Sequence, residues 1–121
     1  EQEFLSRHPV PTVSLQDSLY EKRMWRGPAW NSMTMWAARG CMRYGRYEEA
    51  GRLLEAALDG TSRIYSQTGC IWEFYDSLGG RPEQVQRKPQ TGFNMPCRDY
   101  LGHNPLHYMA GLWEECRHAK R

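Results

Sequence analysis

The chain has 121 residues, with 16 Lys or Arg, 14 Asp or Glu and a formal net charge of +2. This length allows one small domain, and basic residues form no run that would indicate nucleic-acid binding. No stretch is long and apolar enough to span a membrane. Five Trp, seven Tyr and six Met offset a shortage of aliphatic residues. Such a composition suits a sugar-binding cleft, although a Trp- and Met-rich helical core is the plainer explanation.

The cysteines predict neither a disulfide framework nor a metal centre. They are widely spaced and form no C-x-x-C pair, so we expect buried, inert thiols. A zinc site can be drawn from Cys97, His103, His107 and Cys116, but this spacing matches no familiar zinc pattern. We therefore expect no metal and no cofactor.

The first predicted element is a helix over about 32–44, after an irregular segment over 1–30. Asn31 or Ser32 can cap this helix, and Gly45 can end it. Apolar residues cover most of its circumference, which is typical of a helix buried on most sides.

A second helix is predicted over about 47–65, with one apolar stripe and one charged face. Only Gly45 and Arg46 separate the two helices, so they should be antiparallel neighbours. An inner apolar helix followed by an outer amphipathic helix is the repeating unit of an α/α toroid.

Residues 66–103 form a long, mostly irregular segment, and loops of this length usually have a function. The last helix should start at Asn104 and Pro105, with Asn104 as its cap. The chain then brings the segments 20–30 and 66–103 to one end of the helices. We therefore expect one rim, a candidate cleft, to carry Trp25, Arg26, Trp30, Glu73 and Asp99.

Residues 25–30 place Arg26 between Trp25 and Trp30, on a turn formed by Gly27 and Pro28. Arginine can bind a carboxylate or sugar hydroxyls, and Trp can stack on a pyranose ring. A loop that merely covers the helix ends is the alternative.

Glu73 lies between aromatic residues, and burial together with Arg26 could tune its protonation. A carboxylate in such a place can activate water as a general base. The alternative is a Glu that only braces the loop. Asp99 and His103 precede the last helix, where turn formation and capping could equally explain them.

Several of these segments together resemble glycoside hydrolase family 63 and its relatives, among them mannosylglycerate hydrolase and processing glucosidase I. The similar segments are 11–17, 25–31, 43–45 (RYG), 72–76 (WEFYD) and 99–102 (DYLG). They occur in the family's order and extend over most of residues 9–113.

The resemblance implies a mainly α fold that is part of an (α/α)6 toroid, with long irregular loops at one rim. It implies inverting hydrolysis of an α-glycosidic bond in an oligosaccharide or small glycoside, with Glu73 as general base. Its sugar-binding Trp and Arg residues correspond to Trp25, Arg26 and Trp30. Together with Gly27, Trp72, Tyr75, Asp99 and His103 they are the predicted substrate-binding residues. His103 stands where the family usually has Trp, which leaves the substrate class open.

Residues 1–121 are interpreted as one partial domain from the C-terminal portion of such a barrel. The family's general acid is an Asp upstream, so this segment alone should be inactive. A missing barrel segment or a symmetric oligomer should cover an exposed apolar flank. A trehalase-like or glycogen-debranching-like enzyme, and a non-catalytic sugar-binding or interaction module, are the alternatives.

Overall fold

The computed structural model describes residues 3–90 and 94–119 and contains three α-helices. They are α1 (Asn31–Arg43), α2 (Tyr47–Thr68) and α3 (Leu106–His118), and a short 3-10 helix, η1 (Pro82–Gln84), lies in the loop after α2. No β-strand forms within those residues. This mainly helical structure confirms the mainly α part of the predicted fold class. No helix of the described residues has the length and apolarity needed to cross a bilayer.

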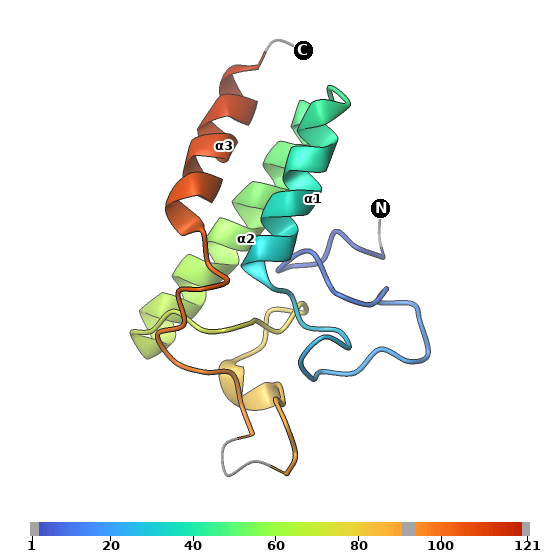
Figure 1. The fold of residues 1–121 in the computed structure, drawn as a ribbon, viewed down its shortest axis with the longest axis vertical. Coiled ribbons are helices and arrows are strands. Elements are labelled where there is room, and N and C mark those ends of the chain that lie inside the picture. Colours follow the sequence, from blue (N-terminus) through green and yellow to red (C-terminus); the bar gives the residue numbers. More distant parts are fainter. Residues whose placement is uncertain (1–2, 91–93, 120–121) are drawn as a thin grey trace.

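The three helices pack around a core of small and large apolar side chains. Ala38 of α1 and Ala50, Leu54 and Ala57 of α2 are completely buried, together with Met109 of α3. The alanines allow the helices to approach closely, and burial of a side chain such as Leu54 contributes about 2 kcal/mol. In Figure 1, α1 and α3 flank α2, which packs against both of them.

All long loops gather at one end of these helices, where α1 and α3 begin and α2 ends (Figure 1). This arrangement confirms that the segments 20–30 and 66–103 reach the same end. Helix α2 is longer than predicted and continues to Thr68, where Gly69 ends it in the left-handed conformation with φ 71°.

Isolated backbone bridges join these loops in place of a sheet. Ala29 and Tyr75 exchange two hydrogen bonds, of 2.8 and 2.9 Å between N and O atoms. The Glu73 amide donates to the Cys97 carbonyl at 2.9 Å. As a result, the segment before α1 and the loop after α2 lie side by side.

The predicted N-caps of α1 and α3 are wrong. Trp30 is the N-cap of α1, Pro105 is that of α3, and neither makes a side-chain cap hydrogen bond. Asn31 and Asn104 are instead buried and bonded to each other, because their amides satisfy buried polar groups of other segments.

This buried network has Asn31 at its centre. Asn104 Nδ2 donates to the carbonyls of Trp72 and Tyr100, at 2.9 and 2.6 Å, so its Oδ1 faces Asn31. Asn31 Nδ2 therefore donates to Asn104 Oδ1 at 2.8 Å and to Thr61 Oγ1 at 2.9 Å. The Asn31 side-chain oxygen, Oδ1, accepts a hydrogen bond from His8 Nε2 at 2.8 Å.

His8 is consequently a neutral histidine with its proton on Nε2. Its ring stacks on Tyr75, with centroids 4.6 Å apart. Its Nδ1 is buried without a hydrogen-bond partner among the described residues, and it lies against Gly60 of α2. Burial lowers the pKa of His8 to about 4, while the bond to Asn31 opposes that shift.

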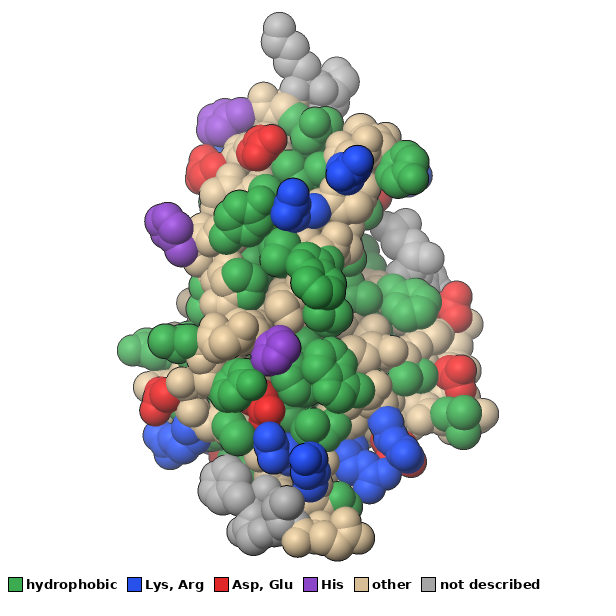
Figure 2. Space-filling model, viewed as in Figure 1, with side chains coloured by type: hydrophobic (Ala, Val, Ile, Leu, Met, Phe, Trp, Pro, Cys, Tyr) green, Lys and Arg blue, Asp and Glu red, His purple; other side chains and the backbone are tan. Residues whose placement is uncertain are grey.

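Helix α1 is not buried on most sides within this chain, contrary to expectation. Only Asn31, Thr34 and Ala38 of α1 are buried, and Trp36 is 61% exposed. Figure 2 shows apolar side chains exposed on the surface of the molecule that faces the viewer. The reason is that α2 and the N-terminal segment cover one side of α1, and α3 contacts it only slightly.

We expect Asn104→Ala to destabilise the chain by about 3 kcal/mol, because it removes the side-chain donor of the Trp72 and Tyr100 carbonyls and the acceptor of one Asn31 N–H. Chemical denaturation would measure this loss. Asn94→Ala is the matched control, since Asn94 is exposed and accepts a bond from the Arg87 amide. Equal effects of the two substitutions would contradict the role of the buried network.

The free energy of unfolding should rise between pH 4 and pH 6.5 because of His8. The unfolded chain binds a proton in that window and the folded chain does not, so stability is lost as pH falls. The shift from 6.5 to about 4 corresponds to about 3 kcal/mol. Denaturation across this range should show the slope in wild type and in His118→Gln, where an exposed histidine is removed. It should vanish in His8→Gln, which keeps a donor for Asn31; an unchanged slope there would exclude His8 as its source.

Candidate active site

Glu73 is a buried carboxylate in the loop after α2, with 3% of its side chain exposed. Arg87 Nε donates to Glu73 Oε1 at 2.8 Å, and Arg87 Nη2 donates to Oε2 at 3.4 Å. The Cys97 amide also donates to Oε1, at 3.2 Å. The guanidinium offsets the cost of burying the ionised carboxylate.

Arg26 is not the partner of Glu73 that the sequence suggested. Its side chain is largely exposed, and it forms an ion pair with Glu21 at 3.5 Å. The partner is Arg87, whose pKa is raised by its hydrogen bond to Glu73. Sequence inspection missed Arg87, because the two residues lie 14 positions apart along a loop and no periodicity fixes their approach.

Arg87 connects Glu73 to an open pocket of about 510 Å³. The pocket is lined by Trp25, Arg26 and Arg87, together with Arg23, Met24, Lys88, Pro89 and Gln90. Most of its charged side chains are cationic. Glu73 therefore lies behind Arg87, next to a cavity that contains the predicted Trp25 and Arg26.

Stacked rings form one wall near this pocket. The Trp25 and Trp30 rings stack with centroids 3.8 Å apart, and Trp25 is 42% exposed. Phe74 lies beneath Trp30, at 5.1 Å between centroids. His103 meets the edges of both indoles and stacks on Tyr100 at 5.7 Å. The structure thus brings Trp25, Trp30 and His103 together.

Gly27 has a structural reason to be glycine at this loop. A Cβ there would overlap the Glu21 carbonyl oxygen and the Tyr20 ring. Its amide donates to Thr12 Oγ1 at 3.0 Å, and its carbonyl accepts from the Thr12 amide at 3.2 Å. These contacts hold the turn that presents Trp25 and Arg26.

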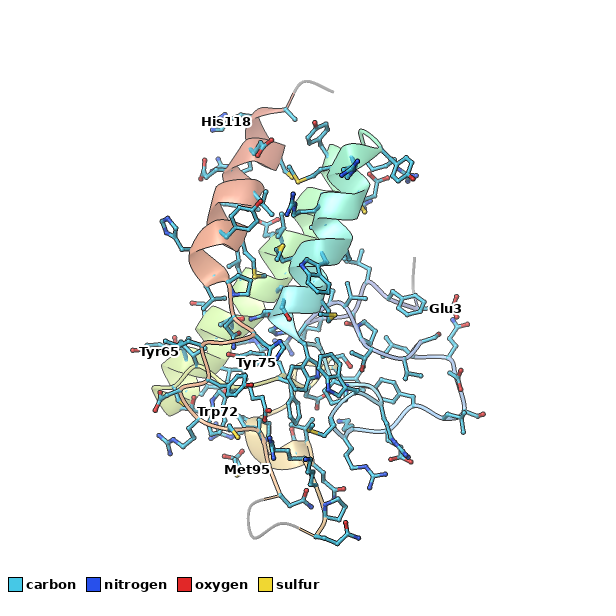
Figure 3. All side chains as sticks on the ribbon, viewed as in Figure 1. Glu3, Tyr65, Trp72, Tyr75, Met95 and His118 are labelled. Atoms are coloured by element: carbon cyan, nitrogen blue, oxygen red, sulfur yellow. The ribbon has the colours of Figure 1, made fainter. Side chains whose placement is uncertain are left out.

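Trp72 and Tyr75 lie at the loop end of the helices (Figure 3). Both are almost fully buried, and the Trp72 amide donates to the Tyr75 hydroxyl at 3.0 Å. Burial raises the pKa of Tyr75 to about 12. Asp99 is exposed on the adjoining loop at φ 52°, where its amide donates to Cys70 Sγ.

Cys97 places a thiol beside Glu73. Burial and the Glu73 carboxylate raise its pKa, which keeps the thiol protonated. Within 3–90 and 94–119 no three potential ligands gather around a metal position, so the zinc arrangement drawn from Cys97, His103, His107 and Cys116 does not form.

Comparison with known families assigns the chain. Residues 1–95 match the model of the mannosylglycerate hydrolase MGH1-like glycoside hydrolase domain. The chain belongs to this family. The match includes the loop that carries Trp25 and Arg26, and both members of the Glu73–Arg87 pair, but it ends before Asp99 and His103. A comparison with curated proteins gave no match.

The Glu73–Arg87 pair should show a coupling energy of about 2 kcal/mol in a double-mutant cycle, because a buried carboxylate receives two bonds from the same guanidinium. The cycle uses Glu73→Gln, Arg87→Met and the double variant in chemical denaturation. An exposed pair in the same loop, Arg81 and Glu83, provides the control, with an expected coupling below about 0.5 kcal/mol. Equal couplings would mean that the buried pair is no stronger than a surface contact.

Proposed function

We propose that this chain supplies the general base and a sugar-binding wall of a glycoside hydrolase that cleaves an α-glycosidic bond with inversion. One observation carries the proposal. The buried Glu73 carboxylate is held by Arg87, which lines a pocket together with Trp25 and Arg26. Membership of a glycoside hydrolase family gives this carboxylate its chemical context.

The reaction assigns a role to each part of the site. Glu73 takes a proton from a water molecule as that water attacks the anomeric carbon. Trp25 offers an exposed ring on which a pyranose can stack, and stacking on Trp30 fixes the orientation of the Trp25 ring. Arg26 reaches the pocket as a donor for sugar hydroxyls, and His103 borders the stacked indoles.

Inversion also requires a general acid, with its carboxyl group about 6.5–9.5 Å from that of the base. We assign the acid to a part of the protein outside these 121 residues, so the segment by itself is inactive. The exposed apolar side chains on the helices, such as Trp36 and Tyr108, then mark where further helices of an (α/α)6 toroid would pack.

In the intact protein that carries this chain, Glu73→Gln should lower kcat about 10²- to 10⁴-fold, because an amide cannot accept the proton of the attacking water. Release of nitrophenol from nitrophenyl α-glucoside and α-mannoside would measure turnover. Glu83→Gln is the matched control, since Glu83 lies in the same loop, pairs with Arg81 and is exposed. Wild-type turnover by Glu73→Gln would remove Glu73 from the mechanism.

A non-catalytic sugar-binding module is the second candidate. The low exposure of Glu73 and its ion pair with Arg87 favour it, because both also suit a carboxylate that braces a loop. The two candidates differ in turnover. A module would bind α-linked oligosaccharides in calorimetry and release no product, and Glu73→Gln would leave that affinity unchanged.

A further inference from the structure

The two oxygens of Glu73 are held unequally. Oε1 accepts from Arg87 Nε at 2.8 Å and from the Cys97 amide at 3.2 Å. Arg87 reaches Oε2 through Nη2 at the longer distance of 3.4 Å. A charge-assisted N–H···O bond is normally about 2.7–2.9 Å long, so the contact to Oε2 is the weaker one.

We propose that Arg87 is the positioning residue for Glu73: it fixes Oε1 and releases Oε2 toward the pocket, where Oε2 takes the proton from water. This proposal rests on the proposed function of Glu73 as general base. It assigns the reacting oxygen and gives Arg87 a role that neither a family match nor a surface ion pair would imply.

The surroundings of Arg87 allow such a release. Its side chain is 26% exposed, against 3% for Glu73, and it lines the open pocket while Glu73 does not. The carboxylate is anchored from the protein side, through the Cys97 amide. A small rotation of the guanidinium can therefore break the long Nη2 contact and keep the Nε bond.

Substrate itself can drive this rotation. A sugar hydroxyl in the pocket beside Trp25 and Arg26 can accept the hydrogen bond from Nη2 in place of Oε2. The guanidinium remains fully bonded, and Oε2 gains a free lone pair for water. Oε2 would thus become available to water only when a sugar is bound.

A lysine could not perform both tasks. Its ammonium is a point charge, whereas the planar guanidinium donates from Nε and Nη2 in a fixed fork. Loss of the fork should therefore affect the proton-transfer step more than substrate binding, because Trp25 and Arg26 remain in place.

The test uses the intact protein with nitrophenyl α-glucoside and α-mannoside. Arg87→Met and Arg87→Lys should lower kcat at least about tenfold while KM changes less than about threefold. In Arg87→Ala, millimolar ethylguanidinium should restore part of kcat, because it can occupy the vacated fork. Arg81→Met, which removes the exposed pair with Glu83, should retain wild-type kinetics and should not respond to ethylguanidinium.

Circular dichroism would establish that each variant is folded, and Arg87→Lys keeps the test valid if Arg87→Met does not fold. Wild-type kcat in Arg87→Lys, or a folded Arg87→Ala that ethylguanidinium does not rescue, would overturn the proposal. These results differ from failure of the proposed function, which would appear as full turnover by Glu73→Gln.

Discussion

The structure depends on the buried amide of Asn31. Its three hydrogen bonds join the N-terminal segment through His8, helix α2 through Thr61 and the start of α3 through Asn104. Asn104 in turn holds the carbonyl of Trp72, the residue before Glu73. Leaving a buried polar group unpaired costs more free energy than a hydrogen bond contributes to stability. The arrangement that pairs all these groups is therefore favoured over the alternatives.

This constraint distinguishes a firmly bonded part of the site from a more exposed part. The backbone on either side of Glu73 is bonded to Asn104 and to Ala29, and Glu73 itself is bonded to Cys97. Arg87 approaches from the pocket side and is partly exposed. A carboxylate held in this way and covered by one guanidinium suits the base that we propose.

The sequence predicts the helices because their apolar residues recur with the helical period, and the short link at Gly45 predicts their antiparallel pairing. From these features follows the single rim that receives both long loops. The predicted N-caps are wrong because an Asn at a helix start satisfies distant polar groups as readily as its own helix, and only tertiary structure decides. Arg87 escapes prediction because no local rule fixes the path of an irregular loop.

In the proposed mechanism, Glu73 acts on water and does not attack the sugar. Proton NMR of the first product that the intact protein forms from an α-glycoside tests it most directly. Activation of water on the face opposite the leaving group predicts that the β-anomer appears first and then mutarotates. Initial formation of the α-anomer would show retention and would contradict this account of the site.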